Sequence, residues 1–384
     1  MSLIENWAYA SHVMQANEGP SFIAHQYAIA GQSGGLYGIM PSPAATAYAM
    51  AENPGTPPPI PTPTPTPLGQ VTYVENGIGT TGNCYTPSQV VFSVNMALPY
   101  TTGSDQSNPF YPPCEEYNTV LDEVSGTLTR PPYFDWQYIA EDKTSIWAAP
   151  MGVNHLYQAY AANETDPTQP FAVDKDAVNF VANLGLPGGP PPNPARPIAA
   201  LTYITPCKTE SDHPDTTPGT VDNGPQWLGW LINSIGASAY WPNTTIIVTW
   251  DDWGGFYDHW KAPPPNSWPY HPPQNVYFDN WPTNDDQDGN EWGFRVPVII
   301  ISPYVQQRGY ISAAPPQPGA QRSQSVILDY VESTFGLPPG ALGTDDKYQT
   351  NDALKDVFNF NASPMAYTPV PGVTFTPPPG GCGN

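Results

Sequence analysis

The chain has 384 residues, of which 11 are Lys or Arg and 34 are Asp or Glu, so its formal net charge is −23. This balance argues against nucleic acid as a partner and against basic attachment to a membrane surface, because both need cations that neutralise phosphate. Charged residues make up only 12 % of the chain, beside 52 prolines and 33 glycines, yet 12 Trp, 23 Tyr and 13 Phe supply core-forming side chains that disordered chains lack. The composition therefore predicts a folded, loop-rich acidic protein.

The first residues do not resemble a signal peptide. Residues 1–15 contain Glu5 and other polar side chains, and they lack a basic stretch followed by an apolar core. No apolar run approaches the roughly 18 residues of a transmembrane helix. Scarce lysine, abundant Trp and Tyr, and Asn-x-Ser/Thr sequons at Asn163, Asn243 and Asn361 nevertheless favour a secreted or extracytoplasmic protein. A processing or cloning event would then account for the missing signal.

Proline-rich segments recur along the chain. Residues 54–67, PGTPPPIPTPTPTP, predict an extended loop insertion, because proline fixes φ and lacks an N–H donor. Further Pro-rich stretches occupy residues 187–197 and 262–273, and a Pro/Gly-rich tail covers residues 367–384. No repeat of solenoid period is present. We expect one domain over residues 1–384, decorated by long Pro/Gly-rich loops.

The cysteines show no metal-site spacing. Cys84 and Cys114 bracket a stretch rich in Pro and Tyr, and a disulfide between them would close a loop of about 30 residues. Unpaired thiols are the alternative, including Cys207 and Cys382, because spacing alone does not decide pairing.

The C-terminal half predicts an α/β domain. Short apolar runs rich in Ile and Val predict three buried strands, at residues 198–204, 244–250 and 296–302. Between the first two, residues 224–239 carry apolar side chains at helical spacing. This order of strand, helix and strand implies a right-handed crossover in a parallel sheet. A second amphipathic helix is predicted over residues 324–335, ending at Gly336. Residues 40–195 are irregular and give no assignment.

The densest polar stretch, TWDDWGGFYDH, follows the second predicted strand. Ligands of an open parallel sheet bind beyond the carboxyl ends of its strands, where Asp251 and Asp252 are expected. Adjacent carboxylates repel one another unless they share a cation, and oxygen ligands suit a divalent metal ion. We therefore predict a metal site at this pair. The alternative is an acidic loop that caps a helix.

Two histidines follow the same predicted strands. His213 comes after the first strand, in ITPCKTESDHP, and His259 comes after the second, beside Asp258. The topological rule that places the acidic pair also places these histidines at strand ends, so all of them can converge on one crevice. Each can act as a metal ligand, general acid or anion-binding donor, and the alternative is a loop histidine without a catalytic role.

Near the N-terminus, NEGPSFIAHQY places Ser21 after a Gly-Pro turn and before an apolar stretch. A serine that opens a helix directs its hydroxyl toward any anion held at the helix N-terminus. Ser21 is therefore a candidate nucleophile, and a plain helix cap explains the residue equally well.

Two further motifs are weaker. Gly31-Gln-Ser33-Gly-Gly35 matches the G-x-S-x-G pattern of serine esterases, but its flanks predict neither the preceding strand nor the following helix. Residues 284–290 resemble the start of a calcium loop, but Arg295 stands where an EF-hand needs Glu, so an acidic surface turn is expected.

Several segments together resemble the phosphoesterase family, which contains bacterial phospholipases C and an acid phosphatase. The resemblance is densest from about 197 to 360 and rests on YITPCKTESDHP, GPQWLGWLINSIG, IIVTWDDWGGFYDH, GFRVPVIIISPY and SVILDYVESTFGL. NEGPSFIAHQY and PPCEEYNTVLDEV also resemble it. The resemblance implies an α/β, alkaline-phosphatase-like layered fold around a central, mostly parallel sheet.

The resemblance also implies a metal-dependent phosphoester hydrolase with a Ser or Thr nucleophile and a covalent phosphoenzyme intermediate. In this chain Ser21 holds the nucleophile's place after Gly-Pro, and His213 corresponds to the histidine that contacts phosphate. Asp251 and Asp252 correspond to the family's metal-binding acidic pair. Asp258 and His259 match an Asp-His pair shared with the family. The implied substrate is a phosphomonoester or a phospholipid.

The sequence departs from the family at its start. The family opens with a strand leading into a Glu-Asn-x-Ser-Phe-Asp motif that supplies further metal ligands. Glu5-Asn6-Trp7 resembles only the beginning of that motif and lies too close to Ser21, so we expect the motif to be absent. Truncation, ligands from a partner, or a degenerate metal site would each explain this.

The missing motif leaves two hypotheses of different classes. The first is a metal-dependent acid phosphatase or phospholipase C. The second is a catalytically inactive structural protein that reuses the fold in a homo-oligomer or larger assembly, since the low surface charge would not resist packing of subunits.

Overall fold

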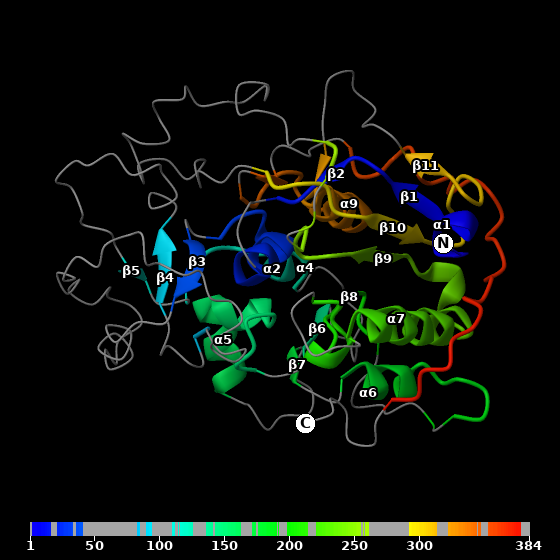
Figure 1. Cartoon of the computed structure of the whole chain (residues 1–384), viewed down its shortest axis with the longest axis horizontal. Helices are drawn as coiled ribbons and strands as arrows, with labels where there is room; N and C mark the ends of the chain where they lie inside the picture. Colours follow the sequence, from blue (N-terminus) through cyan, green and yellow to red (C-terminus); the bar gives the residue numbers. More distant parts are fainter. Residues whose placement is uncertain are drawn as a thin grey trace.

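The protein is described by a computed structural model, drawn in Figure 1. It describes residues 2–16, 21–33, 36–40, 83–84, 90–93, 110–111, 114, 116–125, 136–140, 143–162, 171–173, 176–189, 191, 198–213, 220–254, 256, 258–260, 292–312, 322–343, 345–346 and 352–377. The predicted proline-rich insertion at 54–67 and the acidic turn at 284–290 lie outside these residues.

A four-stranded sheet has the spatial order β11-β1-β10-β9. Its strands are Ile311–Ser312, Ala8–Ala10, Val298–Ile301 and Ile246–Thr249. β10 runs antiparallel to both β1 and β9, whereas β1 and β11 are parallel. The strands predicted at 244–250 and 296–302 are therefore confirmed, but their expected parallel arrangement is wrong. All four residues of β10 are buried. A continuous apolar run indicates that a strand is buried on both faces of the sheet, but it does not indicate the direction of the strand.

The strand predicted at 198–204 belongs to a different sheet. In this second sheet, β6 (Trp136–Ala140) lies between β7 (Phe171–Val173) and β8 (Leu201–Ile204), and both neighbours run parallel to it. The expectation that β8 and β9 flank one crossover within a single sheet is therefore wrong. β6 comes from the region that gave no assignment, and it pairs with β8 along its length. The described chain is a mixed α/β protein with several sheets, some of them parallel.

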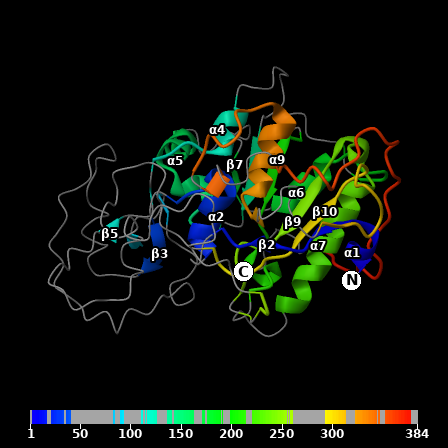
Figure 2. The same ribbon diagram turned by 90° about the horizontal axis from the view of Figure 1, so that it is seen from above.

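Both predicted C-terminal helices are present, as α7 (Thr220–Gly236) and α9 (Val326–Phe335). Figure 2 shows β9 and β10 running between α9 and α7, and side chains from both helices join these strands in one core cluster. Gly336 ends α9 with φ of 69° and donates its N–H to the Glu332 carbonyl, as its position in the sequence predicts.

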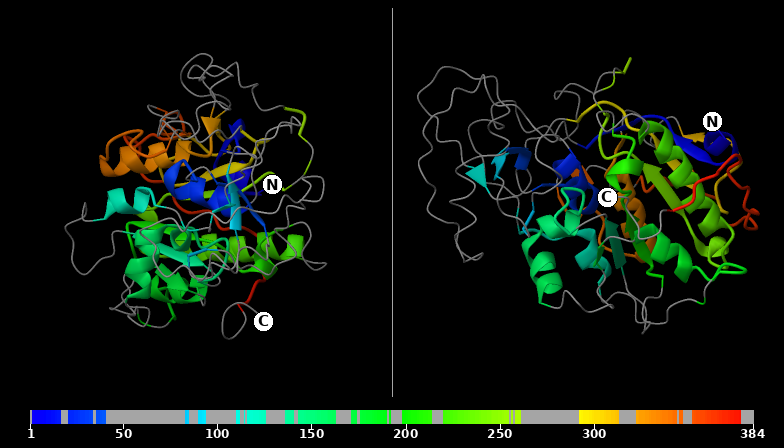
Figure 3. Two further views of the ribbon diagram at one scale, coloured as in Figure 1. Left: turned by 90° about the vertical axis from the view of Figure 1, so that its left-hand side faces the viewer. Right: turned by 60° about the horizontal axis from the view of Figure 1, so that its bottom comes forward.

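The other elements surround these two sheets. A three-stranded antiparallel sheet lies at the opposite end of the molecule from α7 (Figure 3); its strands β3, β4 and β5 are Leu36–Met40, Val90–Ser93 and Phe110–Tyr111. β2 and β12 pair in parallel, and they are Val13–Met14 and Arg322–Ser323. The remaining helices, α1, α2, α4, α5 and α6, are Ser2–Asn6, Ser21–Ala30, Val120–Val124, Asn154–Ala161 and Asp176–Asn183. Three short 3₁₀ helices, η3, η4 and η5, are Ala149–Gly152, Lys208–Glu210 and Trp241–Asn243.

The described part of the predicted tail, up to residue 377, is bound to α7. Asn233 accepts hydrogen bonds from the Tyr367 hydroxyl at 2.7 Å and from the Val370 N–H at 2.8 Å. Gln226, two turns earlier, accepts from the Thr374 N–H at 2.8 Å. The side chains of α7 thus satisfy backbone groups of a tail whose composition alone suggested an irregular loop.

Cys84 and Cys114 form a disulfide, which settles the pairing that the sequence left open. Cys207 is disulfide-bonded too. Within the described ranges, no helix has the length and apolarity to cross a bilayer.

Replacing both Cys84 and Cys114 by serine is expected to lower the free energy of unfolding by about 3–4 kcal/mol, because the bridge closes a loop of 30 residues in the unfolded chain. Urea unfolding of the double variant, compared with the unaltered protein, measures this difference. An unchanged midpoint would show that the bridge does not restrict the unfolded state.

Candidate active site

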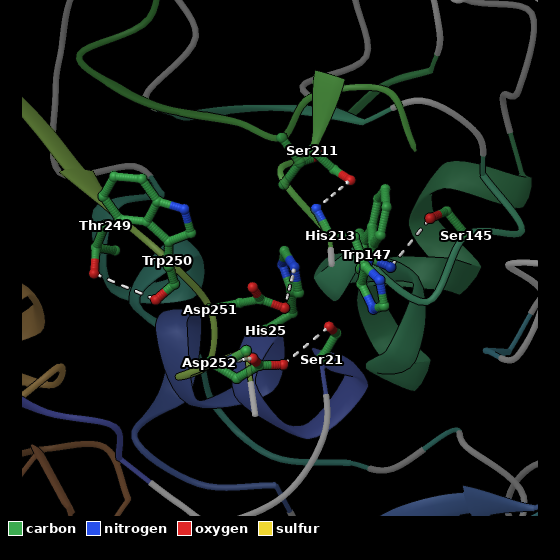
Figure 4. A network of polar contacts seen from close by, with 12 residues as sticks. Ser21, His25, Ser145, Trp147, Ser211, His213, Thr249, Trp250, Asp251 and Asp252 are labelled. Carbon is green, nitrogen blue, oxygen red and sulfur yellow. Dashed lines mark hydrogen bonds and ion pairs between the residues drawn. The ribbon is translucent and has the colours of Figure 1, made fainter. Parts of the chain in front are cut away.

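Helix α2 presents two polar side chains on one face. Ser21 is its first residue and His25 follows four residues later, a spacing that aligns side chains along one side of a helix. Ser21 is only 2 % exposed, and the side chain of His25 is 12 % exposed. Both point toward the segment that follows β9 (Figure 4).

That segment carries the predicted acidic pair. The Ser21 hydroxyl donates to Asp252 Oδ2 at 3.5 Å, and His25 Nε2 lies 3.6 Å from Asp251 Oδ2. Asp252 Oδ1 also accepts the N–H of Gly254 at 2.6 Å, within a turn that Gly254 closes with φ of 69°. The fold therefore brings the predicted nucleophile and the predicted metal-binding pair into contact across 231 positions of the chain.

Burial and neighbouring charge both act on this pair. Burial raises the pKa of Asp252 to about 7, and the negative charge of Asp251 adds to the rise. The hydrogen bonds from Gly254 and Ser21 act in the opposite direction. Two adjacent carboxylates in a partly buried site form an arrangement that a cation would stabilise.

His25 was not predicted as a site residue. Tyr138 donates its hydroxyl proton to the Trp147 carbonyl at 2.7 Å, so its oxygen is left to accept from His25 Nδ1 at 3.2 Å. This arrangement assigns the ring proton to Nδ1 and turns Nε2 toward Asp251. Burial lowers the pKa of His25, and the charge of Asp251 opposes that effect. The available sequence signal was the four-residue spacing from Ser21, which has meaning only once the segment is known to be helical.

Gln324 is a second residue that sequence reasoning missed. Its amide nitrogen donates to the carbonyls of Trp250 at 2.6 Å and Asp251 at 3.1 Å. Its oxygen accepts the N–H of Ala16 at 3.0 Å. Gln324 therefore connects the acidic pair with the segment that leads toward Ser21. The sequence showed it only as the first residue of a predicted helix.

His213 lies on the segment after β8, beside the group formed by Ser21, His25 and the acidic pair (Figure 4). The backbone N–H of His213 donates to the Ser211 hydroxyl at 3.3 Å, and that hydroxyl donates to the Lys208 carbonyl at 2.9 Å. These bonds fix the backbone of the turn that carries the imidazole. The phosphate-contacting role of His213 remains a prediction.

Asp258 and His259 have different surroundings. Arg295 donates Nε and Nη2 to the two oxygens of Asp258 at 2.8 and 2.7 Å. The bonds from Arg295 lower the pKa of Asp258 to about 2, although burial opposes this. His259 is exposed. Among the hydrogen bonds and ion pairs of Asp258 with described residues, none reaches Ser21 or the acidic pair, so a catalytic role for either residue remains a prediction.

The weaker esterase motif is not arranged as an esterase requires. Helix α2, not a strand, precedes Ser33, and Ser33 is 0 % exposed. Gly31 ends that helix with φ of 61°. A nucleophile elbow needs a strand before the serine and an exposed hydroxyl, so the motif is a helix terminus.

The oxygen donors of Asp251 and Asp252 suit a hard divalent cation, and their crowding favours one. Across the described ranges, however, no three His, Cys, Asp or Glu side chains form a group that could hold a metal ion. The pair therefore fits as two ligands of a metal site, without a third ligand beside it among the described residues. Glu5 and Asn6 do not add to it, because α1 lies away from α2, at the other end of β1 (Figures 1 and 2).

Comparisons with known proteins show partial similarity to phospholipases C. The chain is 27 % identical over 181 residues to non-specific phospholipase C6 of Arabidopsis thaliana, which covers 45 % of this chain and 33 % of that protein. It is 30 % identical over 181 residues to phospholipase C A of Mycobacterium tuberculosis, covering 46 % and 32 %, and 31 % identical over 139 residues to phospholipase C B of the same organism, covering 34 % and 24 %. The matched segment thus spans a third or less of these relatives.

A family model described as the Phosphoesterase family matches residues 197–338. This range includes β8, α7, β9, β10 and α9, and with them His213, Asp251 and Asp252. The resemblance that the sequence motifs predicted is confirmed, because residues 197–338 match the model of this family.

Proposed function

We propose that this protein hydrolyses phosphoesters, as an acid phosphatase or a phospholipase C, with Ser21 as the nucleophile. The contact between Ser21 and Asp252 carries the proposal, because it joins a serine at a helix N-terminus to an acidic pair within the segment that matches the family. An assembly protein that only reuses the fold would have no need to hold these side chains together.

The proposed reaction has two steps. Ser21 Oγ attacks phosphorus, the bond from phosphorus to the leaving oxygen breaks, and the departing alcohol takes a proton from solvent. The Ser21 proton passes to Asp252 Oδ2, which is the acceptor of its hydrogen bond. Water then attacks the phosphoserine and the bond from phosphorus to Ser21 Oγ breaks. The serine oxygen takes its proton back from Asp252, the proton of the attacking water passes to solvent, and the phosphate product is released. The N-terminal amides of α2 and the imidazole of His213 would stabilise the phosphoryl oxygens.

Asp251 and Asp252 would supply oxygen ligands to a divalent metal ion. Such an ion would lower the pKa of the attacking hydroxyl and neutralise charge on the phosphoryl group. We further propose that the protein works outside the cytoplasm, since structural disulfides persist mainly in oxidising compartments, and its disulfides fit that environment.

Hydrolysis assays distinguish the hypotheses. We expect turnover of p-nitrophenyl phosphate or p-nitrophenyl phosphorylcholine that falls at least about 10-fold after chelation and returns with added divalent metal. p-Nitrophenyl acetate should not be hydrolysed through Ser21 or Ser33. Absence of phosphoester hydrolysis with every divalent metal, from folded protein, would refute the proposal. Light scattering on the same sample tests the assembly hypothesis, which requires large particles.

A further inference from the structure

The turn that carries the acidic pair, residues 250–254, lies beyond the last strand pairing of β9. The register of β9 with β10 ends at Thr249 and Val298, so the ladder of that sheet does not fix the backbone that follows. Two side chains bind this backbone instead, and both come from the ends of strands in a different sheet, formed by β2 and β12. The orientation of the acidic turn therefore depends on these contacts.

The two side chains are those of Gln15 and Gln324, called here the glutamine pair. Each is the first residue beyond one strand of the parallel β2–β12 sheet, in which Met14 is paired with Ser323. Gln324 extends that pairing, because its backbone N–H donates to the Met14 carbonyl at 3.0 Å. The glutamine pair is buried, with exposed fractions of 0 % for Gln15 and 8 % for Gln324. Buried amides are nearly always hydrogen-bonded, so the contacts of these two side chains define their positions.

The glutamine pair binds the acidic turn on both sides of Asp252. The amide nitrogen of Gln324 donates to the Asp251 carbonyl at 3.1 Å. The amide oxygen of Gln15 accepts the N–H of Trp253 at 3.3 Å. This carbonyl and this N–H belong to the two peptide groups that flank Asp252. The glutamine pair therefore restrains the backbone dihedral angles of the residue whose carboxylate contacts Ser21.

Gln324 also refers the turn to the segment that leads to Ser21. Its amide oxygen accepts the N–H of Ala16 at 3.0 Å, and Ala16 lies five positions before Ser21 in the chain. Because the carbonyls of the turn need a donor and the Ala16 N–H needs an acceptor, only one orientation of the amide satisfies both. One side chain thus fixes the acidic turn against the backbone that precedes α2.

We propose that Gln15 and Gln324 are positioning residues, which set the backbone at Asp252 and thereby direct its carboxylate toward Ser21. The proposal rests on the proposed function for the consequence of this placement. A displacement of about 1 Å can cost about 10²-fold in rate, so a glutamine that touches no substrate can still control turnover. The structural content of the proposal is measurable without any activity.

The N–H of Gly254 reports the position of Asp252, because it donates to Asp252 Oδ1 at 2.6 Å. The chain contains two Trp-Gly pairs, Trp253–Gly254 and Trp292–Gly293. Isotopic labelling of Trp carbonyl carbons and Gly nitrogens therefore leaves two signals in a nuclear magnetic resonance spectrum that selects bonded carbonyl–nitrogen pairs. The signal that is lost in Trp253→Phe belongs to Gly254, and the other is an internal reference.

Two variants remove the contacts independently. Gln324→Met keeps the length of the side chain but can neither donate to the acidic turn nor accept from Ala16. Gln15→Met removes the acceptor of the Trp253 N–H. We expect each variant to move the Gly254 signal by more than its linewidth, and by more than it moves the reference signal. A Gly254 signal that stays in place in either folded variant would overturn the role of that glutamine.

Gln306→Met is the matched control. Gln306 also donates its amide to a backbone carbonyl, that of Phe358 at 3.1 Å, but it follows the end of β10 that lies opposite the acidic turn. The control should leave both signals in place. A movement of the Gly254 signal as large as that in Gln324→Met would show that any lost amide contact has this effect, and would overturn the proposal.

Activity provides a separate measurement. If the protein hydrolyses phosphoesters, Gln324→Met and Gln15→Met should each lower kcat by about 10²-fold with little change in KM, as misplacement of a reacting group does. Gln306→Met should stay within about twofold of the unaltered protein. An unchanged kcat in a variant whose Gly254 signal moves would overturn the positioning role. If the unaltered protein hydrolyses no phosphoester, the proposed function fails, while the Gly254 signal still decides whether the glutamine pair sets the turn.

Discussion

Replacing Ser21 by alanine is expected to lower kcat/KM for p-nitrophenyl phosphate by at least about 10³-fold, because the reaction would lose the atom that attacks phosphorus. Folding should be preserved, since alanine has the higher helix propensity and the hydrogen bond from Ser21 Oγ to Asp252 is long, at 3.5 Å. Steady-state kinetics, together with thermal unfolding of the same preparation, measure both quantities.

Ser33→Ala is the matched control for this prediction. Ser33 is also a buried serine, and it lies just beyond the other end of α2. Ser33 belongs to the G-x-S-x-G motif, which is the alternative nucleophile motif of the sequence. Because Ser21 is assigned as the nucleophile, the Ser33→Ala variant should retain activity within about twofold of the unaltered protein. Full phosphoester hydrolysis by Ser21→Ala, or loss of hydrolysis in Ser33→Ala alone, would contradict the assignment of the nucleophile.

The second large effect concerns stability against pH. Glu332 on α9 and Asp346 are each 0 % exposed, and Glu123 of α4 lies with them. Burial raises the pKa of Asp346 to about 8, with the charge of Glu332 adding to the rise. Burial likewise raises the pKa of Glu123 to about 7 and, with the charge of Asp329, raises that of Glu332. The folded protein therefore retains protons on carboxyl groups at neutral pH.

A carboxyl group with a raised pKa contributes stability that is complete below its unfolded pKa and is lost as the pH rises through its folded pKa. We expect the free energy of unfolding to fall by about 3 kcal/mol between pH 6.5 and pH 8.5. This window lies above the ordinary histidine pKa of about 6.5, so histidines that burial keeps neutral contribute little within it. Urea unfolding at several pH values measures the slope.

Glu332→Gln tests the source of that slope. The glutamine amide can still accept the Gly340 N–H, which lies 2.9 Å from Glu332 Oε2, and it offers a donor to Asp346 in place of a second carboxylate. The variant should therefore lose at least half of the pH dependence. Glu5→Gln, the same substitution on an exposed residue of α1, should leave the slope unchanged. Equal slopes in both variants would place the effect elsewhere in the molecule.

The predicted elements illustrate what local sequence carries. Residues 244–250, 296–302 and 324–335 are confirmed as β9, β10 and α9, because apolar periodicity and a glycine terminus are local signals. The predicted parallel direction of these strands was wrong. The antiparallel pairing of β10 with β9 depends on the partner strand and cannot be read from the sequence of one strand. β6 was missed because it is five residues long and pairs with strands distant in the sequence.

The same division holds for the site. The sequence identified Ser21, Asp251 and Asp252 as candidates through a turn before a helix and an acidic pair after a strand. It could not identify His25 or Gln324, because each acts through a contact across the fold.

By itself, the amino-acid sequence determined that this acidic, loop-rich chain folds with α/β elements and resembles the phosphoesterase family over residues 197–338. Those properties follow from composition and from patterns spanning a few residues. The tertiary structure decided which strands share a sheet, and it decided that Ser21 touches Asp252 across 231 positions. Contact between distant segments depends on the packing of the whole chain, and no short stretch of sequence specifies it.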